Sequence, residues 1–215
     1  MSKGFTSDLG VKRGYHHGNL REALVEAARQ LLAERGPEGF TLVDAARLAG
    51  VSPAAPYRHF RDKDALLAAV AVEGFEAFAL SQTGALKGHA DPIAAFRAMG
   101  LAYLAFAQEN PGAYMAMFAA NPSSLPPLPV AGAGLSGFEA LMASLRPLIG
   151  DPPPPGVEPV ALACQVWALS HGVAMLAAKG MLQKGFSINP QDLLLEGVER
   201  LVRGAVGRPT PQPRE

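Results

Sequence analysis

Cysteine is almost absent from this sequence: Cys164 is the only one in 215 residues. An intrachain disulfide is therefore excluded, and a cluster of several thiolate metal ligands cannot form. A chain without disulfides is typical of a reducing cytoplasm, which is the compartment that we expect. The N-terminal residues also lack the uninterrupted apolar stretch of a signal peptide, so we expect no export.

Charge is scarce and balanced. Charged residues make up 18% of the chain, and 19 Lys and Arg face 19 Asp and Glu, which gives a formal net charge of zero. This argues against a generic polyanion binder, because nonspecific affinity for nucleic acid comes mainly from phosphate neutralisation. Residues 1–64 are slightly basic, with ten Lys and Arg against eight Asp and Glu. A protein that recognises one specific nucleic-acid site needs only a few placed cations, so the charge does not exclude such a protein.

Long apolar runs and alternating strand patterns are missing as well. The nearest approach to a membrane span, residues 159–178, is interrupted by Gln165, Ser170 and His171, and we interpret it as a buried helix. Elsewhere the apolar residues recur at helical spacing between breaks rich in Gly and Pro. We therefore predict an all-α fold of about nine helices, in which a three-helix head precedes a larger helical body.

The most informative pattern that is present is a helix-turn-helix in residues 41–60, TLVDAARLAGVSPAAPYRHF. Thr41 can cap the first helix, with Asp44 as the acidic half of a capping box. Gly50 ends this helix where a left-handed residue is needed. A Ser-Pro pair then predicts a second helix over residues 53–60, because serine is a good cap and proline suits the first helical position.

The region around this pattern resembles a known family. The stretch Tyr15 to Phe78 is similar to the DNA-binding domain of the TetR/AcrR bacterial transcriptional regulators. The residues at the family's spacing are Gly50-Val51-Ser52, Tyr57-Arg58-His59-Phe60, Lys63 and Ala65-Leu66-Leu67. Farther on, Trp167-Ala168-Leu169-Ser170-His171-Gly172 resembles the Trp-His-Gly signature of the C-terminal ligand-binding domain in one TetR subgroup. The resemblance implies a homodimeric DNA-binding regulator, usually a repressor, with a small-molecule effector.

The DNA-contact residues are predicted on the exposed side of the helix-turn-helix. Tyr57 and His59 can hydrogen-bond phosphate, while Thr41 and Lys63 are placed to clamp the DNA backbone on either side of the groove. Arg58 is a candidate for a base edge, for phosphate or for a surface ion pair. The predicted DNA-contact residues are Thr41, Ser52, Pro53, Ala54, Ala55, Tyr57, Arg58, His59 and Lys63.

The middle of this recognition segment departs from the family's commoner pattern. Ala54 and Ala55 can read only shape and methyl groups, which puts direct hydrogen-bond readout in doubt. Pro56 has no amide hydrogen, so we expect the second helix to begin irregularly.

We predict four regions along the chain. Residues 1–18 form a flexible arm, 19–62 the head, 63–206 the body and 207–215 a disordered tail. In the arm, Arg13, His16 and His17 either reach a minor groove or belong to a mobile solvated segment. Adjacent histidines do not aim at one metal, so we expect no metal site. A long helix over residues 63–86 joins head to body, and its expected apolar contributions to the body are Leu66, Leu67, Val70, Phe75 and Phe78.

Large apolar side chains in the body predict either a plain core or, with the resemblance, an effector site. The polar members that would orient a ligand are Tyr103, Tyr114, Trp167 and His171. The alternative for His171 is a hydrogen bond to a neighbouring helix. The predicted effector-binding residues are Phe78, Met99, Tyr103, Phe106, Tyr114, Phe118, Trp167, His171 and Met175.

Catalysis is not expected. Cys164 and His171 lie seven residues apart, about 10 Å along a helix, which is too far for a nucleophile and its base. We find no paired carboxylates, phosphate-binding loop or metal-ligand spacing, and we expect no cofactor. An all-helical carrier of hydrophobic molecules with a vestigial helix-turn-helix remains the alternative function.

The expected mechanism is that of a homodimer on DNA. The last two helices would pair with those of a second copy, and the two heads would then meet half-sites of a palindromic operator about 34–36 Å apart. Effector binding would shift the long helix and release the DNA. Candidates for the apolar seam, which intrachain packing would equally use, are Leu162, Val166, Leu169, Val173, Leu194, Val198 and Leu201.

Overall fold

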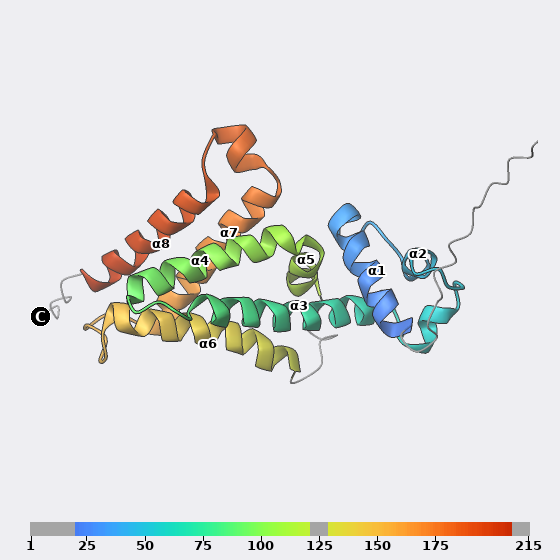
Figure 1. Ribbon diagram of the computed structural model, residues 1–215, viewed down its shortest axis with the longest axis horizontal. Coiled ribbons are helices and arrows are strands. Elements are labelled where there is room, and N and C mark those ends of the chain that lie inside the picture. Colours follow the sequence, from blue (N-terminus) through green and yellow to red (C-terminus); the bar gives the residue numbers. More distant parts are fainter. Residues whose placement is uncertain (1–19, 121–128, 208–215) are drawn as a thin grey trace, which may run out of the picture.

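The structure of the protein is a computed structural model that describes residues 20–120 and 129–207 (Figure 1). The predicted arm, most of a proline-rich break and all but the first residue of the predicted tail lie outside the described residues. The described residues are helical and contain no strand, as the all-α prediction requires. The helices are α1 Leu20–Arg35, α2 Leu42–Leu48, the 3-10 helix Ala55–Arg58, α3 Lys63–Ala85, α4 Pro92–Glu109, α5 Pro111–Ala119, α6 Pro129–Ile149, α7 Pro159–Ala178, the π-helix Met181–Gly185 and α8 Pro190–Val206.

The helices begin where the sequence supplies a cap or a proline. Asp62 accepts a hydrogen bond from the backbone N–H of Ala65 at 2.8 Å and so caps α3. Asp91 does the same for α4, with Pro92 in the first turn. Four more helices, α5 to α8, begin at a proline, whose fixed φ suits a position where the N–H has no helical partner. This rule also explains why α6 starts at Pro129.

The head at one end of the molecule is formed by α1, α2 and the first turns of α3 (Figure 1). Its core contains the apolar face of α1, including Leu24 and Leu32 at 0% exposure. Leu66, Leu67 and Val70 of α3 pack in this same core. The prediction that these three residues belong to the body is therefore wrong, and the head core continues past residue 63.

The body is a bundle in which α3 lies along α4, α5 and α6, while α7 and α8 pack together beyond α4 (Figure 1). The residues predicted as a seam with a second copy face the chain's own core. They are the buried Leu162, Val166, Val173, Leu194 and Val198 and the partly buried Leu169 and Leu201. The intrachain alternative is thus confirmed for the five buried residues, whereas Leu169 and Leu201 keep part of their surface open.

The helix α7 is unusually apolar. By length and composition alone it could cross a membrane, with a mean hydropathy of 1.6 over its best window, of which 33% is buried. It packs against α4, α6 and α8. The prediction of a buried helix therefore holds for one face only, since Val160 and Leu176 on α7 are exposed.

The head and the body are joined by α5 as well as by α3. Ala116 of α5 and Ala120, which follows the last residue of this helix, belong to the head core. Tyr114 and Met117 of the same helix belong to the body core. This second connection is not part of the sequence-based prediction, which assigns the link to the long helix alone. One short helix thus has one face in each hydrophobic core.

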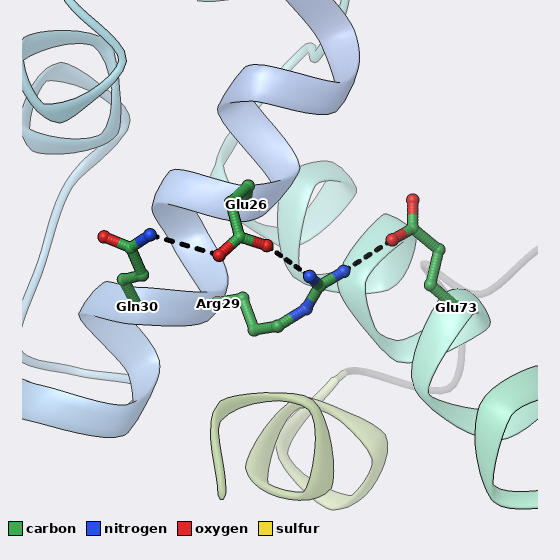
Figure 2. Close-up of polar contacts among 4 residues, drawn as sticks. All are labelled: Glu26, Arg29, Gln30 and Glu73. Atoms are coloured by element: carbon green, nitrogen blue, oxygen red, sulfur yellow. Dashed lines mark hydrogen bonds and ion pairs between the residues drawn. The ribbon is translucent and has the colours of Figure 1, made fainter. Parts of the chain in front are cut away.

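An ion-pair network lies beside this joint (Figure 2). Arg29 of α1 donates from Nη2 to Oε2 of Glu73 on α3 at 2.6 Å, and its Nη1 is hydrogen-bonded to Glu26. Gln30 donates from Nε2 to the other oxygen of Glu26 at 3.1 Å. Because the side chains are about one-third to one-half exposed, the pairs contribute more to orientation than to stability.

Close backbone contact at Gly112 brings α5 against α1. A Cβ placed on Gly112 would lie 2.0 Å from the carbonyl oxygen of Arg29, which is closer than nonbonded atoms can approach. Glycine is therefore required at the first turn of α5 by the neighbouring helix and not by its own backbone angle.

We predict that Gly112→Ala lowers the free energy of unfolding by about 1–3 kcal/mol, because the methyl group must push α5 away from α1. The matched control is Gly84→Ala, since a Cβ on Gly84 in α3 would meet nothing within 4 Å. This control should raise stability by about 0.5–1 kcal/mol, the usual gain for Gly to Ala in a helix. Chemical denaturation followed by circular dichroism measures both. Equal stabilities of the two variants would contradict the close contact.

Candidate functional site

The start of α2 carries the capping box that the sequence predicts. The backbone N–H and the hydroxyl of Thr41 donate to Oδ2 of Asp44 at 2.9 and 2.7 Å, and the Asp44 N–H donates back to Thr41 Oγ1 at 3.2 Å. These hydrogen bonds, with help from Arg47, hold the pKa of Asp44 below its ordinary value. Thr41 is exposed, as a phosphate contact requires, but its hydroxyl proton is held by Asp44 and must turn to reach a phosphate.

The turn after α2 also forms as predicted. Gly50 has φ +72°, the left-handed region, and the N–H of Val51 returns to the carbonyl of Ala46 at 3.0 Å. Val51 is partly buried against the head core.

The recognition segment is shorter than predicted. Only Ala55–Arg58 are helical, and they form a 3-10 helix without a side-chain cap, where the sequence predicts an α-helix from Pro53 capped by Ser52. The reason is the second proline: Pro56 has no N–H to donate to Ser52, whose carbonyl instead accepts from Ala55 at 3.0 Å in a tight turn. The expected irregular start is thus confirmed and extends to the whole segment.

Two buried residues fix this segment to the head, and the residues between them point outward. Pro56 is less than 2% exposed and Phe60 is 4% exposed. Tyr57, at 58% exposure, stands out with Arg58 and His59, which are also exposed. The exposed predicted contacts on the preceding turn are Ser52, Pro53 and Ala54, with Ala55 partly exposed. The predicted DNA-contact residues of this segment therefore share one outward-facing turn.

Lys63 has internal partners that the sequence does not indicate. Its Nζ donates to the carbonyl oxygens of Pro37 at 2.9 Å and Phe40 at 3.4 Å, and it lies 5.5 Å from the centre of the Phe40 ring. Its side chain is 27% exposed. Lys63 thus ties the loop between α1 and α2 to the start of α3, and its substitution would disturb that loop as well as any phosphate contact.

Two family models match this chain. The model of the bacterial regulatory proteins of the tetR family matches residues 24–70, which covers the capping box, the turn and the recognition segment. A second model, for the C-terminal domain of tetracyclin repressor-like proteins, matches residues 96–202. The chain belongs to the TetR family. Its head is therefore the DNA-binding domain of a transcriptional regulator, and its fold and domains are those of a non-enzymatic protein.

Solved structures agree with this assignment. A protein of unknown function from Rhodococcus sp. RHA1 is 30% identical over 91% of this chain and all of its own, with a TM-score of 0.72. PfmR, a TetR family transcriptional regulator from Thermus thermophilus, is 21% identical over 84% of this chain and 97% of its own, with a TM-score of 0.63. AibR in complex with isovaleryl coenzyme A and operator DNA is 17% identical over 87% of this chain and 98% of its own, with a TM-score of 0.60.

In the body of this TetR-family protein, the predicted polar effector residues form a connected chain. The hydroxyl groups of Tyr103 on α4 and Tyr114 on α5 lie 3.2 Å apart, and the Tyr114 hydroxyl lies 2.8 Å from Nδ1 of His171 on α7. The alternative of a hydrogen bond from His171 to a neighbouring helix is therefore confirmed. This hydrogen bond does not remove His171 from the candidate site, because its partner Tyr114 is itself a predicted effector residue.

Aromatic rings surround this chain. Phe78 lies edge-on to Tyr103 and Phe106, with ring centres 5.1 and 5.3 Å apart. Phe118 contacts Tyr114, Trp167 and His171, with ring centres 5.1, 6.4 and 4.3 Å apart. We call the seven connected residues the aromatic cluster, and they are Phe78, Tyr103, Phe106, Tyr114, Phe118, Trp167 and His171.

The remaining predicted residues border the cluster. Met99 is buried in the body core and Met175 packs against it. Phe75 and Phe138, which the prediction omits from the site, contact Phe118 and Trp167 with ring centres 6.4 and 6.3 Å apart. Phe75 shares the face of Phe78 along α3, so spacing could have found it. In the described residues, no group of three His, Cys, Asp or Glu is arranged to hold a metal.

Burial determines the protonation of the cluster. Desolvation raises the pKa of Tyr103 and Tyr114, so both stay neutral. Desolvation lowers the pKa of His171 below its ordinary value, so the imidazole is neutral near pH 7. The cluster therefore offers neutral hydrogen-bonding groups at one end of an apolar interior, while Phe118 and Trp167 remain 39% and 42% exposed.

We predict that His171 makes the stability of the protein fall as the pH decreases below about 6.5, its ordinary pKa. The unfolded chain takes up a proton there, whereas the folded protein, with its lowered pKa, takes it up only at lower pH. Denaturation at pH 7.5 and 5.5 should show a larger loss in the wild type than in His171→Gln. An equal loss in both proteins would count against a desolvated His171.

Proposed function

We propose that this TetR-family protein is a repressor that binds a palindromic operator as a homodimer and leaves it when a small apolar effector binds in the body. The observation that carries the proposal is the outward-facing turn with Tyr57, Arg58 and His59, which Pro56 and Phe60 fix to the head. Side chains on such an anchored, exposed turn can contact DNA at little conformational cost. Because a bacterial repressor binds chromosomal DNA, the proposal also includes a cytoplasmic location.

The proposed contacts to the DNA backbone come from Tyr57, His59 and Thr41, with Lys63 contributing through the loop that it holds. Arg58 is the one long cation on the recognition segment, and it reaches either a guanine edge or a phosphate. Ser52, Pro53, Ala54 and Ala55 lie deepest in the groove. Because two of these are alanines, sequence is read there by shape and by thymine methyl groups.

The proposed dimer contact uses the open face of α7. Val160, at 59% exposure, and Leu176, at 39%, lie on this helix together with the exposed small residues Ala161, Cys164 and Ala168. An apolar face with small side chains favours close packing with a second helix, and an uncovered patch of this kind is unusual in a monomer. A second copy of the chain would bring two such faces together.

The proposed route from effector to DNA runs through α5 and α3. Tyr114 and Phe118 of α5 belong to the aromatic cluster, while Gly112 and Ala116 press against the head. A ligand that moves the cluster therefore moves a helix that is also part of the head core. Such a ligand must bind the DNA-free arrangement more tightly than the DNA-bound one.

The effector site is proposed to be the aromatic cluster with Met99 and Met175. Neutral tyrosines and histidine among aromatic rings suit a largely apolar ligand with a polar group. AibR, a protein of the same fold, has been crystallised with both isovaleryl coenzyme A and operator DNA. The Trp-His-Gly motif, of which Trp167 and His171 lie in the cluster, supports placing the chain in that TetR subgroup.

We predict that selection of bound fragments from random DNA enriches a palindrome with half-sites about 34–36 Å apart. Tyr57→Ala should weaken binding of the selected fragment about tenfold, the effect of losing one good contact. The matched control is Phe186→Ala, which removes an aromatic ring that is 66% exposed in the body. Enrichment of no palindrome would overturn the proposal and favour the hydrophobic carrier.

We predict that Ala168→Arg raises the dissociation constant of the dimer about 100-fold or more, because it places an unpaired charge in the apolar contact of α7. Ala77→Arg, at an exposed alanine of α3, is the matched control and should leave the dimer intact. Sedimentation equilibrium measures both constants. A dimer that tolerates Arg at position 168 would show that the interface lies elsewhere.

A further inference from the structure

Gln82 is a polar side chain that the fold and the proposed contacts do not account for. It lies on α3 at 1% exposure, and its Nε2 has no hydrogen-bond partner in the described part of the chain. An amide donor that has lost water without gaining an acceptor destabilises the folded protein. A side chain of this kind is expected where a ligand supplies the missing acceptor.

Apart from the tyrosines of the aromatic cluster, the other buried polar side chains of the described residues are Ser144 and Ser170, and both are satisfied. Ser144 donates to the carbonyl of Leu141 at 2.7 Å, and Ser170 donates to that of Val166 at 2.9 Å. These are ordinary bonds within a helix. Gln82 thus differs from them in having a buried donor without an acceptor.

The position of Gln82 connects it to the aromatic cluster. It follows Phe78 by four residues, so the two side chains share a face of α3. Helices α3 and α4 run in opposite directions and pack together (Figure 1). Since Phe78 contacts Tyr103, the residue one turn farther along α3 lies at the level of Met99, one turn earlier on α4. By this register Gln82 lies one helical turn beyond Phe78, on the side of the cluster away from the head.

The charge of the interior restricts the ligand. No charged side chain is buried in the described residues, so an ionised carboxylate or phosphate beside Gln82 would have no cation to pair with. A neutral oxygen acceptor on an apolar skeleton meets the requirement, because the amide N–H donates to it and the aromatic rings enclose the rest.

We propose that Gln82 donates from Nε2 to the carbonyl oxygen of a neutral, largely apolar effector such as a ketone, ester or amide. This assignment rests on the proposed effector site and names the chemistry that the site recognises. Gln82 lies on the helix whose first turns carry Leu66 and Val70 of the head core. The hydrogen bond therefore forms directly on the element that joins effector and DNA-binding head.

The test compares ketones with hydrocarbons of the same shape. Acetophenone, butyrophenone and hexanophenone are titrated against the full chain alongside ethylbenzene, butylbenzene and hexylbenzene, and binding is followed by calorimetry and by thermal stability. At least one ketone should bind about tenfold more tightly than its hydrocarbon, the usual effect of one satisfied buried donor. The Nε2 protons of Gln82 should shift in nuclear magnetic resonance spectra with the ketone only.

Gln82→Met removes the donor at nearly constant volume, and Gln108→Met is the matched control at an exposed glutamine of α4. The preference for ketones should vanish in Gln82→Met and persist in Gln108→Met, and ligand-free Gln82→Met should melt at a higher temperature than the wild type. The assignment would be overturned by a preference for ketones that survives in Gln82→Met, or by a wild type that shows no such preference. It would also be overturned if no ketone bound at concentrations up to its solubility limit. The selection of operator fragments uses no ketone, so it tests the proposed DNA binding independently of the assignment of Gln82.

Discussion

The close packing of α5 against α1 is the contact on which the arrangement of head and body depends. At Gly112 the two backbones touch with no side chain between them, and from this point α5 places Ala116 in the head core and Tyr114 in the aromatic cluster. The ion pair from Arg29 to Glu73 ties α1 to α3 beside the same joint. Two helices, instead of the single long one expected from the sequence, therefore connect the two parts. A displacement of α5 in the body would therefore also displace residues of the head core.

Much of the local structure could be predicted because it depends on residues close in sequence. The capping box of Thr41 and Asp44, the left-handed Gly50 and the irregular start at Pro56 are all decided within a few positions. Most members of the aromatic cluster could also be predicted to lie together, because large apolar residues at helical spacing mainly face the interior. Helical periodicity identifies an inward face, but it does not say which core that face joins.

This limit accounts for the differences between the predicted and the observed packing partners. Val70 joins the head core and Val166 the chain's own body core, although periodicity fits other partners equally well. The partners of Lys63 are carbonyl groups of a loop more than twenty residues away, which only the folded chain brings near. Gln82 is hidden for the same reason, since a glutamine in a helix is usually exposed. Which turns of a helix face which neighbour is decided by tertiary packing.

In the recognition segment, the residues that hold the segment to the head differ from the residues that are proposed to contact DNA. Pro56 and Phe60 hold it in place, and the residues that face outward between and before them contribute little to the head core. In the proposed complex with DNA, substitutions at Ser52, Ala54 or Arg58 would therefore change the sequence that is read while leaving the fold and its stability nearly unchanged. A duplicated copy of this regulator could acquire a new set of target promoters through a few exposed changes. The positions at which substitutions would alter the proposed DNA recognition without loss of stability therefore lie together in one short turn.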